Sequence, residues 1–240
     1  MRRARRVRRD RYRVMTVRLS RTFLLRKLHQ LTGIVPLGLF LLEHFYTNSK
    51  ALTGERSGDF NRAVVDLQSI PYIIFVEIIG IFIPLLYHAI YGVFITWEAR
   101  PNNLHYPYPR NWFYTIQRVT GMILFFFITF HVLNFRFGAI PGLNTRSVAD
   151  NASSAFSIVS GEFQNITILI VYFIGITATV WHFANGLWLF AVDWGIVIGE
   201  RAQRLMGYAC IGFGVFLLAV GLNAAMAFVW EGGLLGGLVK

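Results

Sequence analysis

The sequence predicts an all-α integral membrane protein with five transmembrane helices. Apolar residues make up 55% of the 240 residues and charged residues only 15%. Five apolar stretches each reach the roughly 20 residues that a helix needs to cross a bilayer. Because no water in the hydrocarbon core can bond to a free main chain, these stretches are expected to be helices. We therefore expect one polytopic membrane unit, whose single cysteine, Cys210, excludes a disulfide framework and a cysteine-ligated iron–sulfur cluster in this chain.

The expected elements follow one another along the chain without a soluble domain between them. A basic N-terminal tail (1–27) precedes the membrane domain (28–231), and a short C-terminal tail (232–240) follows it. The five spans are expected, in order, over about residues 29–48, 70–97, 112–135, 165–194 and 204–230. The first four are predicted to form a helix bundle.

The tail carries much of the net charge of +11, since residues 1–27 hold eleven arginines and Lys27. Such charge also occurs in nucleic-acid-binding proteins, but ahead of a membrane span it favours contact with anionic lipid at the cytoplasmic face. No nucleic-acid partner is expected, and Met15 is an alternative start. With the tail in the cytoplasm, 17 Lys and Arg lie inside and six outside, so the N-terminus is predicted to be cytoplasmic.

Four histidines lie inside apolar spans, one in each of the first four: His44, His88, His131 and His182. An ionisable side chain in a bilayer is costly and by default marks function. Four neutral imidazoles are enough to hold two haem irons with two axial ligands each. The alternative is that they are polar side chains that hold helices together. No C-x-x-C-H motif is present, so the haems would be non-covalent.

Depth in the membrane sorts these histidines into pairs. Counted from the cytoplasmic ends of their helices at 1.5 Å per residue, His44 and His131 lie about 26 and 28 Å deep. On the same scale His88 and His182 lie about 14 and 18 Å deep. The predicted pairs are therefore His44 with His131, nearer the outside, and His88 with His182, nearer the cytoplasm.

A weak internal repeat agrees with this arrangement. Residues 29–44 (HQLTGIVPLGLFLLEH) and 117–131 (QRVTGMILFFFITFH) each contain Thr-Gly and an apolar run that ends in histidine. In the second and fourth spans, Gly92 and Gly186 stand four residues after a histidine. At that spacing they share its face, where a missing side chain would admit a flat macrocycle; small-residue helix packing is the alternative. Pro84 is expected to kink its span.

Other polar residues near the membrane are candidates for quinone or haem contacts. Glu77, eleven residues before His88, returns to nearly the same helix face about 16 Å farther out. It is a candidate proton acceptor for quinol chemistry, with an interfacial Glu as the alternative. The cytoplasmic helix ends carry candidate contacts to haem propionates or to a quinone headgroup: His29, Gln30, Arg118 and Asp193. His29 is expected to begin its helix and is not counted as a ligand.

Several runs resemble one known family: RKLHQLTGIVPLGLFLLEH, IFIPLLYHAIYGVFI, RNWFYTIQRVTG, ITFHV and HFANGLWLFAVDWG. Over about residues 20–230 the chain resembles the single-chain, five-helix, two-haem cytochrome b subunits of succinate:quinone oxidoreductases, and also those of fumarate reductases. The resemblance implies that His88 and His182 bind the proximal haem b and that His44 and His131 bind the distal one. Asp193 is a departure, because some relatives carry a basic residue there.

The resemblance also implies a partner set and a location. The subunit would anchor a flavoprotein and an iron–sulfur subunit on the cytoplasmic side of a prokaryotic inner membrane. Electrons from succinate would pass through the two haems to quinone, usually menaquinone. The direction of catalysis and the oligomeric state, a higher oligomer of the complex included, stay open. The alternatives are a stand-alone transmembrane b-type cytochrome and a haem-free anchor or proton-relay protein.

Overall fold

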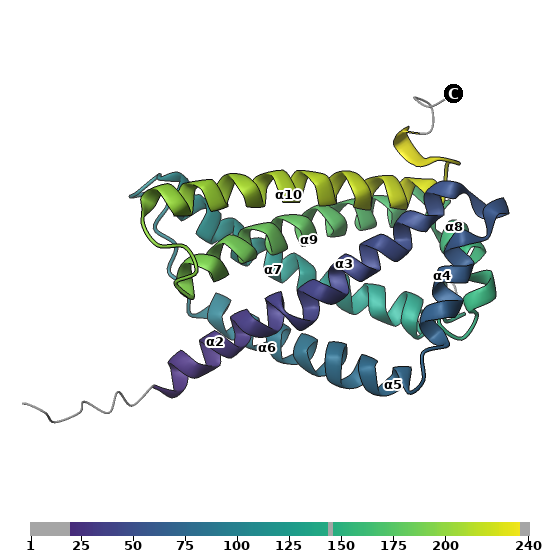
Figure 1. Cartoon of the computed structure of the whole chain (residues 1–240), viewed down its shortest axis with the longest axis horizontal. Helices are drawn as coiled ribbons and strands as arrows, with labels where there is room; N and C mark the ends of the chain where they lie inside the picture. The colour runs from purple at the N-terminus through teal and green to yellow at the C-terminus, as the bar shows by residue number, and fades with distance from the viewer. Residues whose placement is uncertain (1–19, 144–145, 236–240) are drawn as a thin grey trace, which may run out of the picture.

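The computed structural model describes residues 20–143 and 146–235, and all regular secondary structure in these ranges is helical. Four helical segments are long and apolar enough to cross a membrane: Ile73–Trp97, Pro109–Arg136, Ile166–Asp193 and Glu200–Ala227. They run along the long axis of the molecule (Figure 1). These segments agree with the last four predicted spans to within a few residues at each end, and the prediction of an all-α membrane fold is confirmed.

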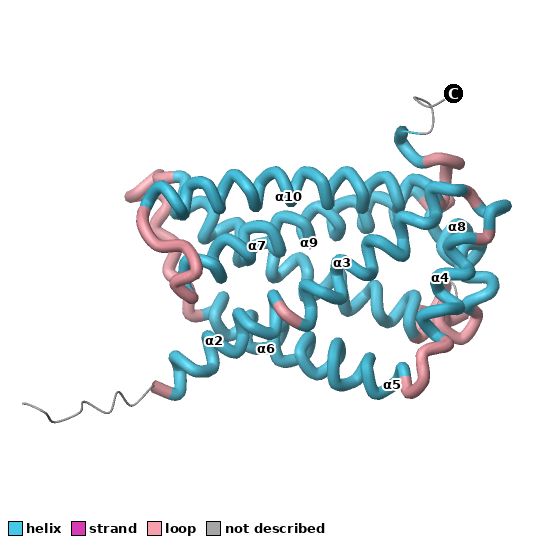
Figure 2. The backbone as a smooth tube through the Cα atoms, viewed as in Figure 1, coloured by secondary structure: helices cyan, strands magenta, loops and turns pink. Residues whose placement is uncertain are grey.

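The first predicted span is helical but divided. α2 (Arg21–Ile34) and α3 (Pro36–Ser49) are separated at Val35, which Figure 2 shows as a short loop. Pro36 has no N–H to donate, so the helical hydrogen-bond ladder is interrupted at this position, while Val35 keeps helical backbone angles (φ −81°, ψ −72°). Each half has 14 residues, which is too short to cross a bilayer alone. A fifth span formed by both halves therefore stays a prediction.

α2 also begins earlier than expected. Its N-cap is Ser20, whose side chain accepts a hydrogen bond of 3.1 Å from the main-chain N–H of Phe23. Such a cap satisfies one of the free N–H groups at a helix start. Part of the expected tail is thus helical, and residues 1–19 lie outside the described ranges.

The second span changes helix type along its length. It begins with α5 (Ile73–Phe75), continues as the π-helix η4 (Val76–Phe82) and ends as α6 (Ile83–Trp97). Pro84 occupies the first turn of α6, where its missing N–H breaks the regular α-helical ladder. A π segment ends two residues before Pro84, and the kink expected at Pro84 stays a prediction. π segments inside α-helices are frequent at functional sites.

The long helices pack around α9 (Ile166–Asp193). This helix contacts α7 (Pro109–His131), α10 (Glu200–Ala227) and α2, and α2 in turn contacts α6. The helix of α7 continues as a π segment, η5 (Val132–Arg136). We call the end of the bundle where α2 begins the tail end and the opposite end the cap end; they lie at the left and right of Figure 1.

The cap end is covered by two short helices, α4 (Asp59–Gln68) and α8 (Ala155–Phe163), and by short 3₁₀ segments. These segments are η2 (Lys50–Thr53), η3 (Glu55–Ser57), η6 (Ala152–Ser154) and η7 (Gly233–Leu235). Buried side chains of the cap form one cluster with the helix ends, and it includes Phe60, Phe135, Phe156, Phe163 and Phe228. Burial of apolar area in this cluster holds the cap on the bundle.

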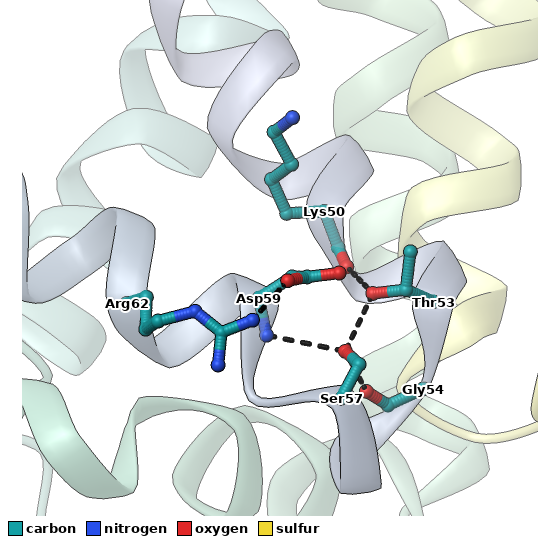
Figure 3. A network of polar contacts seen from close by, with 6 residues as sticks. All are labelled: Lys50, Thr53, Gly54, Ser57, Asp59 and Arg62. Carbon is teal, nitrogen blue, oxygen red and sulfur yellow. Dashed lines mark hydrogen bonds and ion pairs between the residues drawn. The ribbon is translucent and has the colours of Figure 1, made fainter.

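A polar network shapes the turn between η2 and α4 (Figure 3). The hydroxyl of Thr53 donates to the carbonyl of Lys50 at 2.8 Å and lies 2.7 Å from the hydroxyl of Ser57. Ser57 accepts from the main-chain N–H of Asp59 at 3.1 Å, and the Asp59 carboxylate pairs with Arg62. The nearby Thr53 hydroxyl, together with Arg62, lowers the pKa of Asp59 below its ordinary value.

Candidate functional site

The four membrane histidines meet in two pairs. At the tail end, the rings of His88 (α6) and His182 (α9) have centroids 6.3 Å apart and planes at 83°. Toward the cap end, the rings of His44 (α3) and His131 (α7) have centroids 5.7 Å apart, also at 83°. These are the two pairs that the depth of each residue along its helix predicts. We refer to them as the tail-end pair and the cap-end pair.

The spacing of the rings fits a metal ion held between two imidazoles. A bond from imidazole nitrogen to metal is about 2.0 Å, and the ring centroid lies about 1.2 Å behind the nitrogen. Two such ligands with a metal ion between them therefore have centroids about 6.4 Å apart. The tail-end pair, at 6.3 Å, is close to this separation. The cap-end rings, 5.7 Å apart, would reach it by separating by about 0.7 Å.

Main-chain carbonyls hold both rings of the tail-end pair. Nδ1–H of His88 donates to the carbonyl of His29 at 2.9 Å, and Nδ1–H of His182 donates to the carbonyl of Gln117 at 3.1 Å. A hydrogen bond at Nδ1 fixes the tautomer, and this leaves the Nε2 lone pair for a metal. Neither Nε2 makes a hydrogen bond within the described ranges.

The internal repeat explains why the two rings are held alike. His29 and Gln117 occupy the same place in the two repeats, and Gly33 and Gly121 follow four residues later. A Cβ added at Gly33 would lie 2.4 Å from Cε1 of His88, and one at Gly121 would lie 3.2 Å from Cε1 of His182. Each repeat therefore supplies one carbonyl that binds a ring of the tail-end pair and one glycine that leaves space for that ring.

Gly92 and Gly186, which follow His88 and His182 by four residues, were expected to leave space for a flat macrocycle, but they contact side chains of other helices. A Cβ at Gly92 would lie 3.2 Å from Cε1 of His29, and one at Gly186 would lie 3.5 Å from Nε2 of Gln117. These positions let the side chains of α2 and α7 approach, which is the helix-packing alternative. The glycines that contact the paired histidines, Gly33 and Gly121, belong to the Thr-Gly repeats instead.

His29 lies inside α2 and not at its start, so that expectation was wrong. The helix begins eight residues earlier at Arg21, because Ser20 caps it. The His29 ring stacks on His88 with centroids 4.1 Å apart and planes at 12°. Its Nδ1 is buried without a hydrogen-bond partner in the described ranges. Since a buried polar atom is costly to leave unpaired, this nitrogen is available to an oxygen of a bound group.

Two of the other tail-end candidates contact each other. Nε2 of Gln30 donates to Oδ2 of Asp193 at 2.5 Å, and Nζ of Lys27 donates to the carbonyl of Asp193 at 2.7 Å. Asp193 thus has an amide and an ammonium group beside it. Arg118 lies apart from this cluster, with its guanidinium 3.4 Å from the ring centroid of Tyr114.

The cap-end pair is held differently. Nδ1 of His131 lies 3.2 Å from the hydroxyl of Tyr172 on α9. The ring of His44 makes no hydrogen bond to the described residues, although its carbonyl accepts one from Asn48. Tyr172 was not among the residues expected at the site, because it stands in an apolar run where an aromatic residue predicts packing.

Glu77 lies in the π segment η4 and is 9% exposed. Its Oε2 pairs with the guanidinium of Arg136 at 2.7 Å. Arg136 follows His131 by five residues, so the carboxylate lies toward the cap end, as its place in the sequence predicts. The ion pair is a partner that sequence reasoning did not identify, because the two residues are 59 positions apart.

Comparison with known proteins gives two matches. Residues 97–221 match the family described as succinate dehydrogenase/fumarate reductase transmembrane subunit. The chain is also similar to the succinate dehydrogenase cytochrome b558 subunit of Bacillus subtilis (strain 168), with 40% identity over 210 residues. That alignment covers 88% of this chain and 98% of the relative.

Proposed function

Because the chain belongs to the family of succinate dehydrogenase/fumarate reductase transmembrane subunits, we propose that it carries two haem b groups. In this proposal it anchors a flavoprotein and an iron–sulfur subunit to the membrane and passes electrons between them and quinone. The observation that supports this most strongly is the tail-end pair, whose centroid separation of 6.3 Å fits two imidazoles on one iron.

At the tail end, His88 and His182 would be the axial ligands of the proximal haem. Their Nδ1 atoms are already bonded to main-chain carbonyls, so Nε2 of each ring is presented in a fixed orientation. His29, whose Nδ1 is buried without a partner in the described ranges, is a candidate donor to a propionate or a quinone oxygen. Gln30, Asp193 and Arg118 are further candidates at the same end.

At the cap end, His44 and His131 would be the axial ligands of the distal haem. Haem iron supplies a one-electron carrier whose potential depends on its axial ligands and their hydrogen bonds. Glu77 is the candidate proton acceptor for quinol on this side, and Arg136 would hold its carboxylate in place. The name of the Bacillus subtilis relative, a cytochrome b558 subunit, supports haem b as the bound group.

The charge distribution supports one orientation of the subunit in the membrane. We propose that the tail end faces the cytoplasm of a prokaryotic cell, because the basic N-terminal segment precedes α2. The flavoprotein and iron–sulfur subunits would then bind on this side, close to the proximal haem. Quinone, expected to be menaquinone, would react within the membrane.

Single histidine substitutions test the proposal. His88→Ala is expected to remove the proximal haem and leave more of the distal one, and His44→Ala is expected to do the reverse. Haem per chain and the reduced-minus-oxidised spectrum of the purified complex measure both. If His88→Ala left both haems spectrally intact, the assignment of ligands would be refuted.

A further inference from the structure

We propose that Tyr172 is a positioning residue for His131, and that Asn134 connects it to the cap helix α8. The proposal rests on the two-haem function above. It concerns how the ring of a distal ligand is oriented, and it assigns roles to three residues, Tyr172, Asn134 and Glu162, that are not ligands themselves.

The phenol of Tyr172 is fixed in place by its neighbours. Its side chain is almost fully buried on α9, and its hydroxyl lies 3.2 Å from Nδ1 of His131. The rings of Phe127, Phe135 and Phe163 surround it, with centroids 5.3, 5.6 and 4.8 Å away. A close-packed aromatic ring has little freedom to move, so the hydroxyl stays at the imidazole.

A buried amide lies beside the phenol and links it to the cap. Asn134 has no exposed surface, and its side chain is a neighbour of the Tyr172 phenol. Its Nδ2 donates to Oε2 of Glu162 on α8 at 2.7 Å, whereas its Oδ1 has no partner in the described ranges. The oxygen of the Tyr172 hydroxyl lies at Nδ1 of His131 and can accept its Nδ1–H. This arrangement leaves Nε2 of His131 for iron.

The two histidine pairs differ in what holds them. Both tail-end rings donate to main-chain carbonyls, which a side-chain substitution does not remove, although the Thr120 hydroxyl also lies 3.2 Å from Nδ1 of His182. His131 instead depends on a side chain, and that side chain depends on the cap through Asn134 and Glu162. A hydrogen-bond acceptor at Nδ1 makes an imidazole ligand more basic, and a more basic ligand stabilises the oxidised iron. The phenol should therefore lower the midpoint potential of the distal haem alone.

The test compares Tyr172→Phe with Tyr87→Phe in the purified complex. Tyr87 is a matched control because it directly precedes His88. Its hydroxyl donates to the carbonyl of Leu25 at 2.8 Å and makes no hydrogen bond to the His88 ring in the described ranges. Redox-titrated visible spectra give the midpoints, and electron paramagnetic resonance reports the ligand geometry of each ferric haem. The haem that His44→Ala removes identifies the distal signal.

In Tyr172→Phe we expect two haems per chain and an upward shift of the distal midpoint only. The expected size is up to about a tenfold change in the ferric-to-ferrous ratio, which is about 59 mV for one electron. The distal resonance signal should also change, and Tyr87→Phe should alter neither midpoint. Asn134→Leu keeps the phenol but removes the amide behind it, and it should shift the same midpoint by less.

Unchanged distal midpoint and resonance signal in both Tyr172→Phe and Asn134→Leu would overturn the proposal. Equal shifts of both haems, or the same shift in Tyr87→Phe, would also overturn it, because the effect would then be general packing. Fewer than two haems in the unsubstituted protein would refute the proposed function itself, and the positioning role with it.

Discussion

Gly33→Ala is the substitution whose effect the structure specifies most closely. The added Cβ would lie 2.4 Å from Cε1 and 2.8 Å from Nδ1 of His88. Ordinary contacts of a Cβ begin at 3.4 Å, so the ring would have to move by about 1 Å. It cannot do so in place, because Nδ1 donates to the carbonyl of His29 at 2.9 Å.

The expected loss combines two costs. Forcing an extra methyl group into a packed site costs about 1–3 kcal/mol. Disturbing the hydrogen bond behind a metal ligand typically lowers metal affinity by about 10- to 100-fold. Gly33→Ala should therefore lose most of the tail-end haem and retain the cap-end one. Gly121→Ala, with a contact of 3.2 Å to His182, needs a shift of only a few tenths of an ångström and should lose less.

The matched control is Gly212→Ala on α10, where an added Cβ meets nothing within 4 Å. It should leave haem content unchanged, since alanine favours a helix over glycine by about 1 kcal/mol. Haem per chain and reduced-minus-oxidised spectra of the three variants provide the assay. Two haems per chain with unchanged midpoints in Gly33→Ala would refute the inference that the His88 ring needs a glycine at position 33.

Glu77→Gln should slow quinone turnover and also destabilise the protein. The Glu77–Arg136 pair is partly buried, so the cost should stay below the roughly 3–5 kcal/mol of breaking a fully buried pair. The double variant Glu77→Gln, Arg136→Gln should recover thermal stability without recovering turnover, and recovery of both would reduce Glu77 to a structural role. The pKa of Asp59 is lowered by Thr53 and by Arg62. The stability that the Asp59 carboxylate gives the cap is therefore fully present above the ordinary aspartate pKa, and it is lost as the pH falls through the lowered pKa. Asp59→Asn should remove that part of the acid dependence of the melting temperature, and an identical acid profile would contradict this expectation.

The pairing of the histidines could be predicted from the sequence because a helix has a fixed rise per residue. Depth follows from counting alone, and the counted depths of His44, His88, His131 and His182 predict the contacts that the structure shows. Which side of a helix faces a neighbour depends on packing, and counting does not give it. This is why the contacts of Gly33 with His88 were missed.

Other differences had a signal in the sequence. The division of the first span between α2 and α3 follows from Pro36, because a proline lacks the N–H that continues a helix. The early start of α2 follows from the capping residue Ser20. Tyr172 had no such signal, since only the fold brings its hydroxyl to His131 on another helix.

The central claim is that this chain holds two haem b groups between four histidines. It is tested most directly by a redox-titrated visible spectrum of the purified protein together with its haem-to-chain ratio. The account predicts two non-covalent b haems per chain with separable midpoints. One haem, or none, would contradict the pairing of His44 with His131 and of His88 with His182 as ligands.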